Sequence, residues 1–205
     1  MTTNTRKHGL SGERVLGLLA SAFWAGVGGL YLALLGRQPS VNYVALGGYS
    51  LLIALLFLVR RPRRASGSPL MFLVALAATL LPMLALKPAP GGFTLAGLVI
   101  QVYGLVGAII SLVSLGRSFG MAPAYRGVVT GGAYNVVRHP LYLAELVNLL
   151  GYLIAQPSVW NAVVIIATLA AQVVRIVAEE RLLSRDPLYR IYRSQVRWRL
   201  IPGVW

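Results

Sequence analysis

Six long apolar runs, separated by short polar or basic connections, constrain the fold of this chain more than any other feature. An α-helix rises about 1.5 Å per residue, so a run of about 20 residues crosses the hydrocarbon core of a bilayer, which is about 30 Å thick. The pattern therefore predicts an all-α integral membrane protein with about five to six transmembrane helices. The runs are Val15–Leu35, Val41–Val59, Pro69–Leu86, Phe93–Leu115, Leu141–Ala155 and Val159–Ala178.

Composition supports this class and excludes others. Charged residues make up 12% of the chain, about half the share found in soluble domains. The chain has no cysteine, two histidines and five carboxylates, so we expect no disulfide, no thiolate chemistry and no metal centre. The net charge of +14 would suggest nucleic acid in a soluble protein. Here the basic residues lie between apolar runs, so we expect membrane lipids as partners and no nucleic acid.

The basic residues also predict an orientation. If the six runs alternate in direction, 17 of the 19 Lys and Arg residues lie on one side of the membrane, and only Arg37 and Lys87 lie on the other. Basic residues concentrate on the cytoplasmic side of membrane proteins. We therefore expect both termini in the cytoplasm.

Three regions follow from this division. Residues 1–14 form a polar N-terminal segment that we expect to be disordered or interfacial, and residues 15–115 form a four-helix transmembrane region. Residues 116–205 comprise a polar loop, a helical hairpin and a tail, Arg181–Trp205, whose basic and aromatic residues are typical of an interfacial segment.

The last two apolar runs are separated only by Gln156–Ser158, which predicts a tight helical hairpin. The run Leu141–Ala155 is about 22 Å long as a helix, short for a full span, so whether it crosses completely stays open. His139 lies 18 residues before Pro157 and Glu179 lies 22 residues after it. The hairpin therefore brings the two side chains to the same end, where we expect a cytoplasmic pocket.

Glu145 lies about one turn inside the hairpin, and Arg175 on the other leg is a candidate partner for it. A carboxylate one turn inside a membrane helix costs about 2–3 kcal/mol unless it is paired or hydrated. Glu145 is therefore either the structural ion-pair partner of Arg175 or a group that faces a ligand. Arg175 and Glu179 are four residues apart, which suits either an ordinary helix-surface pair or a ligand site. We expect Glu180 to be a second, more exposed carboxylate.

His139 precedes Pro140, and this order restricts its backbone and suits Pro140 to the first turn of a helix. A single histidine is most often structural, so a ligand role for His139 needs further support. The chain has no glycine-rich dinucleotide motif, no phosphate loop and no Ser/His/Asp set. A nucleotide-like cofactor would therefore bind without a soluble dinucleotide fold.

Four blocks in residues 116–205 resemble the isoprenylcysteine carboxyl methyltransferase family, which is related to the phospholipid N-methyltransferases. The four apolar runs before them match only as hydrophobic helices. The blocks are Gly132–Tyr134, Arg138–Tyr142, Arg175 with Glu179–Leu183, and Tyr189, Tyr192 and Val196 with Arg199–Pro202.

The resemblance implies an integral membrane enzyme that uses S-adenosylmethionine and methylates a lipophilic acceptor. It implies that Arg175 faces the acceptor as the catalytic residue and that Glu179 binds the cofactor's ammonium. Methyl transfer needs alignment and desolvation more than acid–base groups, and Arg175 suits a carboxylate acceptor. The residues implied to line the cofactor pocket are Arg126, Gly127, Val128, Val129, Tyr134, His139, Pro140, Leu141, Tyr142 and Glu179.

Two departures from eukaryotic members shape the expected substrate. The chain is shorter, and Glu145 lies near the acceptor side at a place expected to be uncharged. We therefore expect a prokaryotic relative in the inner membrane, with Glu145 in contact with an amphipathic lipid or isoprenoid acceptor. Two alternatives are an NADPH-dependent membrane reductase of the sterol-reductase type, and a small transporter or scaffold, although the chain halves show no inverted repeat.

Overall fold

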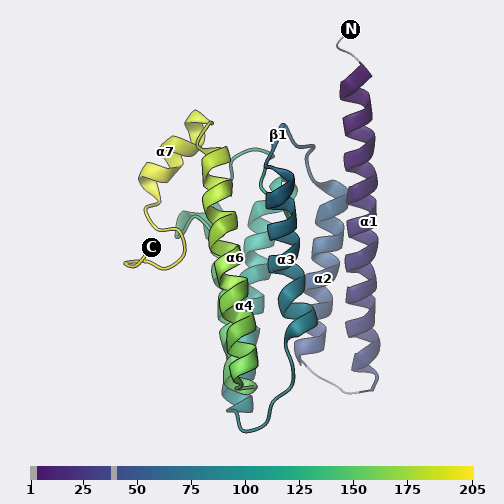
Figure 1. Ribbon diagram of the computed structural model, residues 1–205, viewed down its shortest axis with the longest axis vertical. Coiled ribbons are helices and arrows are strands. Elements are labelled where there is room, and N and C mark those ends of the chain that lie inside the picture. The colour runs from purple at the N-terminus through teal and green to yellow at the C-terminus, as the bar shows by residue number, and fades with distance from the viewer. Residues whose placement is uncertain (1–3, 38–40) are drawn as a thin grey trace.

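The computed structural model describes residues 4–37 and 41–205, and within them it has the predicted all-α membrane fold (Figure 1). Among the described residues, three helices are long and apolar enough to cross a membrane, with spans Gly12–Leu35, Thr94–Ser118 and Val159–Leu183. The other three apolar helices are shorter. The α-helices are α1 (Asn4–Leu35), α2 (Val41–Val59), α3 (Pro69–Ala85), α4 (Thr94–Leu115), α5 (Pro140–Ala155), α6 (Val159–Leu183) and α7 (Pro187–Gln195).

Local sequence explains where several of these helices begin. Pro69, Pro140 and Pro187 each stand in the first helical turn, where a missing N–H costs nothing. The Ser158 side chain accepts a hydrogen bond from the Asn161 amide and caps α6. Helix α6 continues to Leu183, five residues past the apolar run, so both of its terminal glutamates are helical.

The polar N-terminal segment is part of α1 rather than a separate disordered piece. Residues 1–3 lie outside the described residues, and helix α1 begins at Asn4. Glu13 reaches from α1 to Arg126 (2.7 Å) and to Arg63 (3.8 Å). Ion pairs to two distant loops therefore hold α1 at its third turn.

The expected tight hairpin is wrong in one respect, because α5 makes its closest contact with α4 instead of α6. A Cβ added at Gly97 would lie 2.5 Å from the Gly151 carbonyl, and one at Gly104 would lie 2.4 Å from the Asn148 amide nitrogen. Glycine lets two membrane helices approach until their backbones touch. Helix α6 packs mainly along α3, and it meets α5 through longer polar side chains such as Gln172.

The strongly basic connections gather at the upper end of Figure 1, which carries β1, α7 and the start of α1. We call it the basic end because Arg60–Arg64 and the loop 116–139 also lie there. Strand β1 (Ala65–Ser66) pairs antiparallel with β2 (Ala124–Tyr125) and ties these two connections together. Two short 3-10 helices, η1 (Gly116–Ser118) and η2 (Gly132–Asn135), shape the longer loop.

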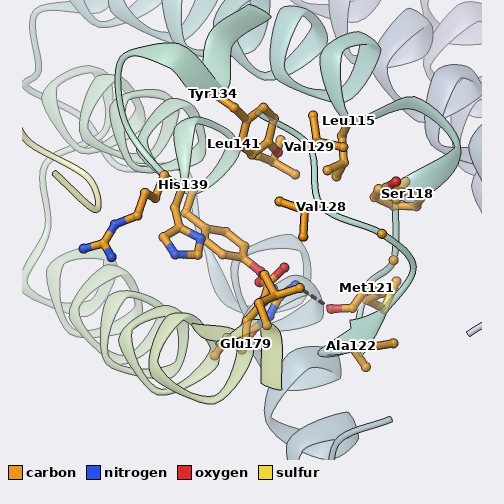
Figure 2. Close-up of a pocket in the computed structure, with 18 of the residues that line it drawn as sticks. Leu115, Ser118, Met121, Ala122, Val128, Val129, Tyr134, His139, Leu141 and Glu179 are labelled. Carbon is orange, nitrogen blue, oxygen red and sulfur yellow. Dashed lines mark hydrogen bonds between the residues drawn. The ribbon is translucent and has the colours of Figure 1, made fainter. Parts of the chain in front are cut away.

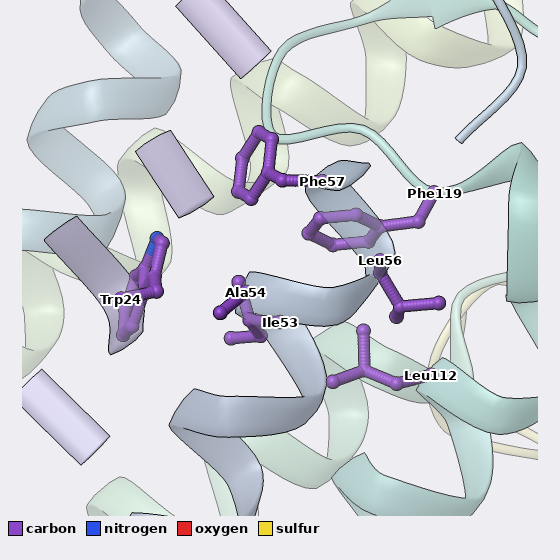
Figure 3. Close-up of a cluster of buried hydrophobic side chains, with 7 residues drawn as sticks. All are labelled: Trp24, Ile53, Ala54, Leu56, Phe57, Leu112 and Phe119. Carbon is purple, nitrogen blue, oxygen red and sulfur yellow. The ribbon is translucent and has the colours of Figure 1, made fainter. Parts of the chain in front are cut away.

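A buried apolar cluster supports this loop from below (Figure 3). Trp24 comes from α1, Phe57 from α2 and Leu112 from α4, while Phe119 comes from the loop itself. The rings of Phe57 and Phe119 meet edge to face with centroids 5.2 Å apart. The first two helices therefore help to position the loop that builds the site.

Candidate functional site

A pocket opens at the basic end between the loop 118–129, the start of α5, the end of α6 and α7 (Figure 2). It contains about 1050 Å³ of empty space, part of it continuous with solvent. Figure 2 shows Tyr134, His139 and Glu179 around one cavity, as the hairpin argument predicts. The predicted residues in its wall are Gly127, Val128, Val129, Tyr134, His139, Leu141, Tyr142, Glu145, Arg175 and Glu179.

Glu179 presents a half-buried carboxylate to this pocket. The Tyr142 hydroxyl donates to its Oε2 atom at 3.0 Å. Among the described residues, no cationic nitrogen lies within 4 Å of it, and this includes Arg175 on the same helix. The charge of Glu179 therefore remains available to a cationic group in the pocket.

Arg175 is a buried cation in the same wall, 6% exposed. Its Nη2 atom donates to the Met121 carbonyl at 2.5 Å, and its guanidinium lies 4.9 Å from the Tyr142 ring centroid. Its Nε atom has no hydrogen-bond partner among the described residues. A buried guanidinium with an unused donor favours an anionic ligand, because an unpaired buried charge is costly.

Among the described residues, the ion pair considered between Glu145 and Arg175 is not formed within 4 Å. The Glu145 carboxylate instead accepts from the Tyr49 hydroxyl at 3.1 Å and from the Gln172 amide at 2.9 Å. These neutral donors come from α2 and α6. Glu145 thus joins three helices while it faces the pocket.

Glu180 is buried, so the expectation that it is the more exposed carboxylate is wrong. It is 4% exposed and lies between two arginines and a histidine. Its oxygens lie 3.2 Å from Nη1 of Arg138, 3.3 Å from Nε2 of His139 and 2.9 Å from Nε of Arg199. The His139 ring forms one side of the pocket, stacked on Tyr142 with centroids 5.6 Å apart. Its Nε2 atom is engaged by Glu180, so His139 shapes the wall while it anchors the tail.

Two residues predicted to line the cofactor pocket are not among those in the wall of this pocket. Arg126 turns away toward α1, where its Nη2 atom lies 2.7 Å from Glu13 and its Nη1 atom donates to the Arg61 carbonyl. Pro140 is buried in the first turn of α5, whereas its chain neighbours His139 and Leu141 line the pocket. Arg126 is absent from the wall because its long side chain pairs instead with the carboxylate of Glu13.

Two tail tyrosines that the sequence suggested to be interfacial are buried in the pocket wall. Tyr189 and Tyr192 are each 3% exposed and cluster with Tyr134. The Tyr192 hydroxyl donates to the Tyr134 carbonyl at 2.7 Å, and burial raises the pKa of Tyr192 to about 12. The Tyr189 hydroxyl has no partner among the described residues. Their three-residue spacing in α7, which places both on one helix face, was the available signal.

Comparison with known families identifies the region that builds this pocket. Residues 92–190 match the family model described as phospholipid methyltransferase. The matched segment runs from just before α4 into α7, so it includes the fourth apolar helix and ends before Val196. Comparison of the chain with curated proteins gives no match.

Proposed function

On the premise that the chain belongs, through residues 92–190, to the phospholipid methyltransferase family, we propose that it is an S-adenosylmethionine-dependent methyltransferase for a lipophilic acceptor. The family indicates a membrane methyltransferase. The cofactor, the acceptor and the cytoplasmic position of the site are our proposal. The family match also favours methyl transfer over the reductase and transporter alternatives.

The pocket's donor set fits the cofactor. When bound, S-adenosylmethionine supplies an electrophilic methyl group on a positively charged sulfur. The unpaired Glu179 carboxylate suits an ammonium, and the unpartnered Tyr189 hydroxyl suits a polar group of the same ligand. Tyr134 and Val128 offer aromatic and apolar walls that exclude water, which methyl transfer requires.

A second cavity supports a lipophilic acceptor. It lies among the helices of the bundle, has about 1440 Å³ of empty space, part of it open to the surroundings, and is lined mainly by apolar side chains of α1 to α6. It shares Trp24, Tyr49, Thr79 and Glu145 with the pocket, so the two spaces are adjoining. The acceptor's apolar chain would occupy this cavity and place its head beside Glu145.

Arg175 and Glu145 would then position the acceptor head between them. The Arg175 guanidinium offers its free Nε donor to an anionic group. Glu145 offers a carboxylate already oriented by Tyr49 and Gln172. The single observation that carries the proposal is the convergence of Glu179, Arg175 and Glu145 on adjoining cavities inside the matched domain.

Calorimetry with S-adenosylhomocysteine on the detergent-purified protein tests the proposal. We expect binding, and we expect Glu179→Gln to weaken it about 10- to 100-fold, since a hydrogen bond to a charged group contributes about 1.5–3 kcal/mol. Glu145→Gln is the matched control and should bind as the native protein does. Absence of binding, or equal affinity in the Glu179 variant, would contradict the proposed cofactor site.

A further inference from the structure

A separate cleft lies between α1 and α2 at the basic end, and Phe57 of the apolar cluster forms part of its lining. Its upper part is basic and its lower part is apolar. It contains about 1350 Å³ of space that is open to solvent. The lining residues are Glu13, Arg14, Gly17, Leu18, Phe57, Leu58, Val59, Arg60, Arg61, Pro62 and Arg117.

The positive charge of this cleft is not balanced by the described residues. Its described lining residues include four arginines and a single carboxylate, Glu13. Glu13 is already engaged by Arg126 and Arg63, which are not among those four. Within the described part of the chain, none of the four lies within 4 Å of a carboxylate. The cleft therefore suits an anion.

Arg60 shows that this charge is held inside the cleft instead of extending into water. It is half-buried, and its guanidinium lies 4.7 Å from the Phe57 ring centroid. Its Nη2 atom lies against α1, 3.4 Å from where a Cβ on Gly17 would stand, which is ordinary contact distance. Burial lowers the pKa of Arg60. Partial desolvation of an unpaired cation makes a bound anion more favourable.

The lower half of the cleft faces the surrounding lipid. Leu18 is 59% exposed and Leu58 is 56% exposed, and both lie on apolar helix surface. Arginines above such side chains reproduce the order of a phospholipid, with its charged headgroup above its acyl chains. Basic pockets between membrane helices are known to bind anionic lipid headgroups.

We propose that this cleft is a binding site for an anionic phospholipid, whose phosphate group contacts Arg14, Arg60 and Arg117 and whose acyl chain follows Leu18 and Leu58. Basic loops alone suffice to orient a membrane protein, but orientation does not require arginines to converge on one cleft. The proposal is independent of the methyltransferase assignment. The cleft nevertheless adjoins that site, because Phe57 beneath Arg60 packs on Phe119 in the pocket loop.

The test measures the thermal unfolding temperature of the full chain in phosphatidylcholine nanodiscs, with increasing phosphatidylglycerol at constant ionic strength. A ligand that binds the folded state raises this temperature. We expect phosphatidylglycerol to raise it saturably, and inorganic phosphate to have no effect. Arg14→Gln and Arg60→Gln should each weaken the apparent affinity for phosphatidylglycerol about five-fold. The affinity is measured as the lipid fraction that gives half of the rise in unfolding temperature, and about five-fold corresponds to one basic residue near an anionic surface. The matched control is Arg193→Gln, which removes an exposed charge from α7.

Each other outcome overturns the proposal. An equal response of all three variants would show general surface electrostatics, and an equal effect of inorganic phosphate would identify a free anion as the occupant. Absence of any response to phosphatidylglycerol would exclude a lipid site. Arg14 is exposed and has no hydrogen bond to other described side chains, so its substitution leaves a folded protein in which the comparison is valid.

Discussion

Two adjacent glutamates at the end of α6 have different environments. We therefore expect one to act in ligand binding and the other in the stability of the fold. Successive residues on a helix point about 100° apart, so Glu179 faces the pocket while Glu180 faces the tail. Replacing Glu180 with glutamine leaves Arg138 and Arg199 without their common anion. Loss of one partner from a buried pair costs about 3–5 kcal/mol. We expect a loss of this size in the free energy of unfolding, measured by denaturation in detergent micelles.

Glu179→Gln is the control at the neighbouring position. Its carboxylate accepts one hydrogen bond, from Tyr142, and a glutamine oxygen can still accept it. The unfolding free energy should therefore change by less than about 1 kcal/mol. If the Glu179 variant were the less stable of the two, the assignment of these two roles would be wrong.

Arg175 gives a second prediction at this scale, on kinetics. Arg175→Gln should raise the KM for the lipid acceptor at least about ten-fold, because a charge-assisted contact to an anionic group is lost. Affinity for S-adenosylhomocysteine should stay unchanged, and Arg175→Lys should recover part of the loss because it keeps the charge. Steady-state kinetics with labelled lipid and calorimetry measure the two quantities. An equal loss in both would mean that Arg175 acts by holding the Met121 loop through its hydrogen bond.

At the residue scale, the sequence located the pocket but not every contact within it. The spacing of His139 and Glu179 about Pro157 placed both at one end, and they line one pocket. Burial of Glu180 could not be predicted, because it depends on Arg199 in a tail that folds back on the helices. The same return of the tail explains why Tyr189 was interpreted as interfacial.

At the scale of the elements, hydropathy predicts helices but not their partners. The apolar runs agree with the observed helices to within a few residues, except where polar turns extend α1 and α6. Hydropathy does not indicate which helices pack against each other. The α4–α5 contact depends on small residues that lie opposite each other on the two helices. Gly97 and Gly104, seven residues apart on one face of α4, were the signal for it.

The α4–α5 contact makes a testable prediction. Gly104→Ala places a Cβ 2.4 Å from the Asn148 amide nitrogen, a distance that forces the helices apart. We expect a loss of about 1–3 kcal/mol in the free energy of unfolding, as is typical of overpacked sites. Gly29→Ala in α1 is the control, since an added Cβ there meets nothing within 4 Å. An unchanged stability for Gly104→Ala would show that these helices can separate without cost.

At the scale of the whole molecule, the distribution of basic residues and the arrangement of the helices both distinguish the same two ends. The structure brings the loop 116–139, β1 and α7 to one end (Figure 1). The pocket and the cleft between α1 and α2 lie at the same end. The connection Lys87–Gly92 lies at the other. Because basic residues stay on the cytoplasmic side, we expect the site to face the cytoplasm, where soluble cofactors are made.

The chain's lack of cysteine makes this orientation directly measurable. Single cysteines replace Arg64 or Arg193 at the basic end, or Pro90 at the other, and all three positions are exposed. In intact cells, a membrane-impermeant maleimide should label only Pro90→Cys, whereas after lysis all three should react. The cysteine-free parent measures background labelling. Labelling of Arg193→Cys in intact cells would place the pocket outside, and labelling of Arg64→Cys alone would show that the two basic segments lie on opposite sides.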